Sequence, residues 1–222
     1  MRNHPIIPVT EPLQYRAIGL VRATYIPEDT DRFTKGNLVD EEGVEIEAVV
    51  LGRVITLMRR HLDMTKAHLW VVYPRSRKDD EHLHLQIAGV WEPSTLEINK
   101  KASDNDLLVN SDNPIQDKLP EGDDYFSIRG ELIFTKPETG DLVVKIRQRP
   151  KNDGSRPIPF KLPLKGEIPF EKLRHFISFD VRRRGQKLHL EDYQVVAPVP
   201  GKDHKGKSRN PKDIRKGVNK NV

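Results

Sequence analysis

Two stretches of the chain repeat one pattern, and this repeat limits the possible fold more than any other feature of the sequence. In residues 175–196, two runs of alternating apolar and polar residues are joined by a basic segment that ends at Gly185. Alternation with period two around a glycine turn predicts a β-hairpin. Residues 68–87 show a similar pattern around a charged turn at residues 75–80, and Leu-His-Leu occurs in both stretches, at 83–85 and 188–190. The sequence therefore predicts a repeated, mainly β architecture.

The second hairpin separates a core face from a solvent face. Ile177, Phe179 and Val181 fall on one side of the first run, and Leu188 and Leu190 are their expected partners across the hairpin. The polar residues between them point to the other side. The hairpin is therefore expected to pack one face against a core and to leave the other in water.

Composition narrows the compartment and the available chemistry. None of the 222 residues is cysteine, which excludes disulfides and thiol ligands and fits a reducing compartment. No apolar run has the length of a membrane span or of a signal-peptide core. We expect a soluble, cytoplasmic protein with no membrane partner.

Charge is unevenly distributed along the chain. The net charge is +5, but residues 202–222 hold eight Lys or Arg against two Asp, or +6, and the rest carries −1. Residues 143–187 hold thirteen basic and four acidic residues, or +9, whereas residues 92–124 hold three lysines and nine acids, or −6. This segregation predicts that a negatively charged partner binds the second half of the chain.

Changes in composition divide the chain into five parts. Each of the two β units is expected to hold about five short strands, and residues 53–62 have the spacing of a short helix in the first unit. The proposed parts are an extended lead-in (1–14), the first unit (15–91), an acidic linker (92–124), the second unit (125–200) and a disordered basic tail (201–222).

Each unit resembles the OB fold, a five-stranded β-barrel. The resemblance rests on the strand order, on the internal glycines Gly52 and Gly166, and on residues 187–196, which are similar to the closing strands of OB proteins that bind single-stranded nucleic acids. It covers residues 15–91 and 125–196. The chain also resembles conserved cyanobacterial proteins. A double barrel or a sandwich without OB topology is the alternative fold.

The sequence contains no motif of a known catalytic site. It lacks a glycine-rich phosphate loop, a nucleophile elbow and carboxylates at a spacing that forces them together. His82 and His84 share a strand face, but a metal site needs further ligands, so we expect exposed histidines and no metal or cofactor. A non-enzymatic protein is predicted, and a hydrolase with dispersed catalytic residues is the alternative.

The resemblance to OB proteins implies binding of single-stranded nucleic acid, which needs a basic groove and aromatic faces for the bases. Tyr125, Phe176 and Tyr193 are expected to stack on bases, because the alternation leaves each of them off the most apolar face. A phosphate contact and a solvated position remain equal alternatives for His189. The predicted contact residues of the second unit are Tyr125, Lys145, Arg147, Arg149, Lys151, Arg156, Lys161, Phe176, Arg182, Arg183, Arg184, Lys187, His189 and Tyr193.

Other aromatic residues are assigned to the core, and the tail is assigned to nonspecific binding. The aromatic residues expected inside are Trp70, Trp91, Phe126, Phe134 and Phe179. A flexible cationic tail adds affinity by releasing counterions from phosphates. The tail residues with this role are Lys202, Lys205, Lys207, Arg209, Lys212, Arg215 and Lys216.

The function predicted from these observations is binding of single-stranded nucleic acid, RNA rather than DNA, in RNA or DNA metabolism. Replacing Arg147, Arg149 and Arg183 by Glu is predicted to weaken binding without disturbing the fold. The near-neutral first unit, with eleven basic and twelve acidic residues, supports an alternative. In that alternative the protein is an adaptor or regulator of a nucleic-acid-processing enzyme such as a ribonuclease, or of a component of the translation machinery such as a ribosomal protein.

Overall fold

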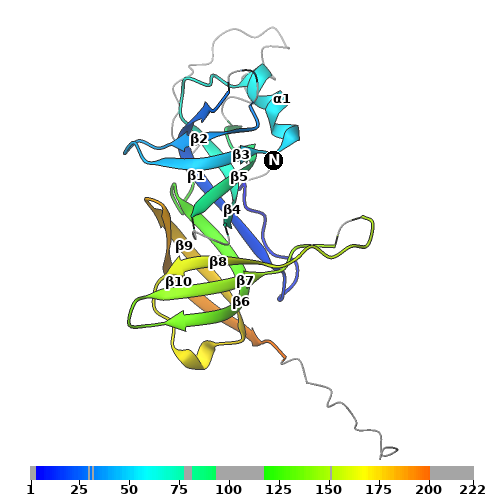
Figure 1. Cartoon of the computed structure of the whole chain (residues 1–222), viewed down its shortest axis with the longest axis vertical. Coiled ribbons are helices and arrows are strands. Elements are labelled where there is room, and N and C mark those ends of the chain that lie inside the picture. The colour runs from blue at the N-terminus through cyan, green and yellow to red at the C-terminus, as the bar shows by residue number, and fades with distance from the viewer. Residues whose placement is uncertain are drawn as a thin grey trace, which may run out of the picture.

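The computed structural model describes residues 4–29, 31, 33–77, 82–93, 118–150 and 152–200. The basic tail, most of the acidic linker and Lys151 lie outside these described residues. The described part is almost entirely β-structure, arranged as two barrels that follow one another along the chain (Figure 1).

The first barrel closes through five strands. The hydrogen-bonded order is β1-β2-β3-β5-β4, and β4 pairs again with β1. The β3–β5 pair is parallel and the other pairs are antiparallel. This connectivity is the one expected for the OB fold. The elements are β1 (Arg16–Pro27), β2 (Lys35–Val39), β3 (Glu45–Val50), α1 (Gly52–His61), β4 (His68–Ser76) and β5 (Leu83–Val90).

The second barrel repeats this connectivity. Its order is β6-β7-β8-β10-β9, and β9 pairs again with β6. The parallel contact that closes it between β8 and β10 consists of one residue pair, Lys165 with His189. The elements are β6 (Tyr125–Lys136), β7 (Asp141–Ile146), β8 (Phe160–Lys165), a 3-10 helix η1 (Phe170–Lys172), β9 (His175–Arg184) and β10 (Lys187–Pro198).

The two barrels share a strand pairing. Residues 16–19 of β1 pair antiparallel with residues 126–129 of β6, so all ten strands belong to one continuous sheet (Figure 1). Gly19 lies opposite Phe126, and a Cβ atom at residue 19 would lie 2.1 Å from the Phe126 ring. A glycine at this position therefore leaves room for the Phe126 ring where the two barrels meet.

Helix α1 forms because its apolar residues lie on one side. Val54 and Met58, four residues apart, are buried against the first barrel. Arg59, Arg60 and His61 occupy the last turn, where the carbonyl ends of a helix favour cations. The short helix expected over residues 53–62 is confirmed.

Most of the predicted core faces are confirmed. Ile177, Phe179, Val181 and Leu188 are buried, and Leu190 is half-buried. In the first barrel, the buried Trp70 donates a hydrogen bond from its indole N–H to the Ala23 carbonyl, 2.9 Å away. Alternation along each strand therefore identified the inner surfaces of both barrels.

Two aromatic residues assigned to the core are not buried there. The β6–β7 register slips between Leu132 and Phe134, so Ile133 is an extra residue in β6 and the alternation reverses. Phe134 is consequently 45% exposed on the outer surface. Trp91 is half-buried, just beyond the end of β5. The prediction of a core position is therefore wrong for Phe134, whereas Trp91 packs against a small core cluster of Ile6, Leu20 and Leu69 without being fully buried.

The prediction that the basic residues form the turn of the second hairpin is also wrong. Strand β9 continues through Arg184, and Lys187 of β10 pairs with Arg184, so the turn contains only Gly185 and Gln186. Gly185 adopts φ 58°, a conformation that glycine tolerates. Arg182, Arg183 and Arg184 are therefore strand residues that point alternately to opposite faces.

Candidate nucleic-acid interface

The outer surface of the second barrel carries a row of charged residues that crosses the strands. Lys136 of β6, Asp141 of β7, Lys165 of β8, His189 of β10 and Arg182 of β9 are neighbours in the strand register. Strand residues in register lie side by side on one face of a sheet. The structure thus aligns cationic and titratable side chains from five strands across one side of the barrel.

A second row, next to the first, is apolar. The exposed Phe134 pairs with Val143, which pairs with Pro163. Lys145 and Lys161 face each other beyond this row. We call this surface the basic face, and it consists of Phe134, Lys136, Val143, Lys145, Lys161, Pro163, Lys165, Arg184, Lys187 and His189.

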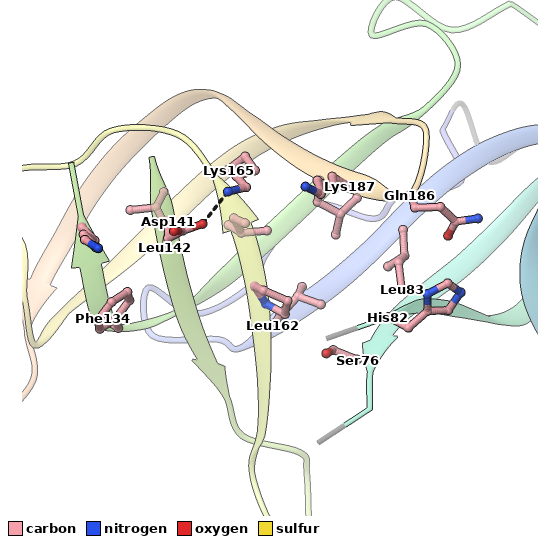
Figure 2. A pocket seen from close by; sticks show the side chains of 14 residues that line it. Ser76, His82, Leu83, Phe134, Asp141, Leu142, Leu162, Lys165, Gln186 and Lys187 are labelled. Carbon is pink, nitrogen blue, oxygen red and sulfur yellow. Dashed lines mark hydrogen bonds and ion pairs between the residues drawn. The ribbon is translucent and has the colours of Figure 1, made fainter. Parts of the chain in front are cut away.

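The few carboxylates at the basic face are already paired. Lys145 forms an ion pair with Glu131 at 2.8 Å, and Lys165 forms one with Asp141 at 2.5 Å, drawn as the dashed line in Figure 2. The remaining cations form no ion pair with the described residues, and they are Lys136, Lys161, Arg184 and Lys187. The basic face therefore keeps positive charge that an anion can neutralise.

The pKa of His189 reflects the same excess of positive charge. Its pKa is lowered first by burial and then by the nearby charges of Arg184, Lys187 and Lys165. A neutral imidazole among these cations can donate a hydrogen bond to a phosphate oxygen, and it can donate to or accept from a base edge.

A hollow adjoins the basic face where the first barrel approaches it. Its volume is about 570 Å³, within the range of ligand sites. Figure 2 shows Phe134, Lys165 and Lys187 of the second barrel on one side and Ser76 and His82 of the first on the other. A ligand in this hollow would touch an aromatic ring, lysine side chains and both barrels.

Phe176 does not belong to the interface. It is 1% exposed, and its ring meets that of Tyr15 edge to face with 4.9 Å between the ring centroids. Arg129 also lies over the Phe176 ring. Because Tyr15, just before β1, covers this position of β9, the expectation that Phe176 stacks on a base is wrong.

Arg183 is buried and does not belong to the interface either. It is 5% exposed and donates hydrogen bonds to Asp40 of the first barrel and to Asp124, both at 2.7 Å. A buried arginine with two carboxylate partners is not available to a phosphate. The expectation that Glu at position 183 leaves the fold intact is therefore wrong.

Two further predicted contacts are held by neighbouring protein groups. Arg182 forms an ion pair with Glu191 and donates to the carbonyl groups of Glu121 and Asp123. The Tyr125 hydroxyl donates to Asp180 at 2.6 Å, and its pKa is raised by burial and by this carboxylate. These side chains have structural partners that compete with a nucleic acid.

The remaining predicted residues are spread over the second barrel. Lys145, Lys161, Arg184, Lys187 and His189 lie on the basic face. Tyr193 is half-buried against the barrel core, and Arg156 is exposed in the loop between β7 and β8. Arg147 and Arg149 follow the end of β7 and line a separate groove. Lys151 and the predicted tail residues lie outside the described residues.

Sequence reasoning missed three charged or aromatic members of the basic face. Lys136 and Lys165 were not singled out because they lie at strand ends, and Phe134 was placed in the core because a regular strand was assumed. The local sequence gives no clear sign of the bulge at Ile133. In the sequence, Lys165 counts only toward the +9 charge of residues 143–187, and Lys136 precedes that segment.

The first barrel carries no equivalent basic surface on β2 and β3. Its described outward residues there include Asn37, Glu45 and Glu47, and Asn37 donates a hydrogen bond to Glu45. His84 is half-buried, and its Nδ1 has no partner within the described residues. The described residues also contain no group of three or more His, Cys, Asp and Glu side chains placed to hold a metal ion.

Two barrels with OB connectivity and a cationic outer face define a tandem OB-fold protein of the nucleic-acid-binding class. The comparisons agree: residues 17–98 match the family model described as "PatR RNA-binding protein, N-terminal OB-fold domain" and residues 128–197 match "Cyanobacterial OB-fold-like RNA-binding domain, C-terminal". The matches span 82 and 70 of the 222 residues, about two thirds of the chain. The two matches therefore support a tandem OB-fold, nucleic-acid-binding protein of cyanobacterial type.

No curated protein matches the chain. Within the described residues, no helix has both the length and the apolar character needed to cross a lipid bilayer.

Proposed function

We propose that the protein binds single-stranded RNA along the basic face of its second barrel, without catalysing a reaction on it. The observation that carries this proposal is the exposed Phe134 on a face where Lys136, Lys161 and Lys187 form no ion pair with the described residues. An exposed ring offers a stacking surface, and unpaired lysines attract phosphates. Both RNA-binding family matches support the choice of RNA.

The position of the basic face within the barrel is a second argument. In OB folds, oligonucleotides bind over the second and third strands and the adjoining loops between strands 1 and 2 and between strands 4 and 5. In the second barrel these strands are β7 and β8, and the loops are 137–140 and 185–186. Lys136 and Lys187 flank those two loops. The cations therefore surround the surface that this fold offers to a strand.

Each group has a defined physical role in the proposed complex. Stacking of a base on Phe134 contributes about 1 to 3 kcal/mol. Lys136, Lys161 and Lys187 neutralise phosphates and release counterions, which makes affinity fall as salt rises. Lysine contacts to phosphates do not read a base sequence, so the proposed binding tolerates many sequences. The chain has no cysteine, which fits a reducing compartment, so the proposed location of the protein is the cytoplasm.

Fluorescence anisotropy of a labelled single-stranded RNA tests the proposal. The variant Lys161→Glu/Lys187→Glu removes two cations of the basic face, and Phe134→Ala removes the stacking surface. We expect the double variant to bind at least about tenfold more weakly and to show a shallower salt dependence. Phe134→Ala should weaken binding by about 1 to 3 kcal/mol with little change in the salt dependence.

Matched controls separate the basic face from general charge. Lys35→Glu/Arg60→Glu makes the same change in net charge on the first barrel, at exposed positions of β2 and α1. Phe170→Ala removes a ring that is 52% exposed on η1. Both controls should bind as the unchanged protein does. Unaltered affinity in the Lys161→Glu/Lys187→Glu variant would show that RNA does not bind here.

The tail is proposed to add affinity that does not depend on base sequence. Replacing its seven predicted cations by Gln should lower the salt dependence while leaving the effect of Phe134→Ala unchanged. If all RNA binding disappears with the tail charges, the site is the tail rather than the barrel. A single-stranded DNA of the same base sequence, measured beside the RNA, tests the preference for RNA.

A further inference from the structure

A second cationic hollow lies between the two barrels, apart from the basic face. It is a groove of about 780 Å³. Residues of β1, β4 and β5, the first turn of α1 and the chain that follows β7 all line it. The lead-in before β1 forms part of its wall, and Arg16 at the start of β1 donates a hydrogen bond to the Ile7 carbonyl at 2.6 Å. The groove therefore exists only where both barrels come together.

The described lining of the groove carries positive charge. Among the described residues, it includes five arginines and no carboxylate, and the arginines are Arg16, Arg53, Arg75, Arg147 and Arg149. Arg16 is held by Ile7 and Ser127, and Arg75 stacks on Phe160 at 4.2 Å. Arg53 and Arg149 are exposed and make no hydrogen bond or ion pair with the described residues. The groove therefore presents guanidinium groups that are free to bind an anion.

The groove also offers flat apolar surfaces. Tyr15, Tyr73, Trp91 and Phe160 line it, and each is half-buried. Arg147 lies over the Tyr15 ring at 5.6 Å. The indole N–H of Trp91 is buried and has no acceptor among the described residues. Guanidinium groups beside partly exposed rings are the combination that single-stranded nucleic-acid sites use.

The groove is continuous with the basic face along one strand. The outward residues at the end of β7 and just beyond it are Lys145, Arg147 and Arg149. Lys145 belongs to the basic face, whereas Arg147 and Arg149 line the groove. Two residues of an extended strand span about 7 Å, so cations are spaced regularly from one surface to the other.

We propose that the groove between the barrels is a second subsite for the same RNA strand, which runs from the basic face along β7 and enters between Arg53 and Arg149. This inference rests on the proposed function and adds the route of the strand and the role of the first barrel. The first barrel contributes Arg53, Tyr73 and Trp91 to the subsite, although its own β2 and β3 carry carboxylates. The continuity of cations from the basic face favours a polynucleotide over an acidic peptide as the occupant.

The test uses the full chain and a labelled single-stranded RNA of about 15 nucleotides, longer than the smallest sites of one OB fold at about 4 nucleotides. The variant Arg53→Glu/Arg149→Glu should weaken binding about tenfold. The first-barrel control Lys35→Glu/Arg60→Glu changes the net charge equally and should bind as the unchanged protein does. Equal affinity of the groove variant and the unchanged protein overturns the proposal.

Tryptophan fluorescence gives a second readout from inside the groove. The chain has two tryptophans; Trp70 is fully buried in the core and Trp91 lines the groove. RNA should therefore quench the fluorescence of the unchanged protein, and Trp91→Phe should remove most of that quenching. If a polyglutamate peptide quenches Trp91 and RNA does not, the groove takes an acidic peptide and the proposal is overturned.

The same measurements distinguish failure of the subsite from failure of the proposed function. If Lys161→Glu/Lys187→Glu binds RNA as the unchanged protein does, the basic face is not the binding site and both proposals fall. If that variant is weakened but Arg53→Glu/Arg149→Glu is not, the basic face stands and the groove subsite alone is wrong.

Discussion

Three consecutive arginines of β9 lie in different environments, although their side chains are identical. Arg184 is exposed, Arg182 is half-buried with Glu191, and Arg183 is buried between Asp40 and Asp124. Burial opposes ionisation of Asp40, but the hydrogen bonds from Arg183 and the backbone outweigh it and hold the pKa of Asp40 below its usual value. One residue of the basic run therefore fastens the barrels together instead of facing a ligand.

Arg183→Met is expected to lower the free energy of unfolding by about 3 to 5 kcal/mol, because it leaves two carboxylates near the barrel junction without their partner. Urea denaturation followed by circular dichroism measures this change. Arg184→Met, one residue away and exposed, is the control and should change stability by less than about 0.5 kcal/mol. Equal effects of the two substitutions would contradict the structural role assigned to Arg183.

At the scale of elements, a charged pair ties the beginning of β4 to the chain after β5. His68 is buried, its Nδ1 lies against a Glu92 carboxylate oxygen, and its Nε2 donates to the Asp63 carbonyl at 2.8 Å. Burial favours the neutral ring, but the interactions with Glu92 and Asp63 outweigh it and raise the pKa of His68. The protonated imidazolium therefore stabilises the edge of the β4–β5 hairpin.

The raised pKa of His68 predicts how stability depends on pH. Its contribution should be fully present below the unfolded pKa of about 6.5 and should disappear as pH rises through the higher folded pKa. The unchanged protein should therefore lose melting temperature relative to His68→Gln as pH rises above about 6.5. His61→Gln changes an exposed histidine of α1 and should keep the original slope. An unchanged slope in His68→Gln would contradict the prediction.

The bulge in β6 shows how one extra residue changes the surface of an element. Without Ile133 in excess, regular alternation would place Phe134 inside the barrel, as the sequence suggested. The bulge instead puts an aromatic ring on the same face as lysines from β6, β8 and β10. The proposed stacking residue therefore results from an irregularity of the strand and not from its pattern.

At the scale of the whole molecule, the barrels are parts of one sheet. The β1–β6 pairing, the Arg183–Asp40 ion pair and the Arg22–Asp123 ion pair, both at 2.7 Å, all cross the junction. A single hydrophobic cluster includes buried residues of both barrels. The groove proposed as the second subsite depends on this fixed arrangement.

The two barrels are therefore expected to unfold in one transition. Both tryptophans belong to the first barrel or its end, whereas circular dichroism reports on strands of both barrels. The two signals should give the same midpoint in urea, as a two-state transition requires. Separate midpoints would show that the junction is too weak to couple the barrels and would also weaken the argument for a preformed groove.

The sequence by itself determined the β class, the two repeated units and most inner faces, because alternation along a strand is a local property. It also located the excess of positive charge and, through the resemblance, the OB fold. It assigned Lys145, Lys161 and Lys187 to an outer surface for the same local reason.

Only the tertiary structure decided which outward side chains remain free. Phe176 is covered by Tyr15, and Arg183 meets Asp40, a residue 143 positions away in the chain. The groove joins Arg53 of the first barrel to Arg149 of the second. Exposure and charge pairing depend on surfaces that segments distant in sequence bring together. They therefore cannot be predicted from the local sequence pattern.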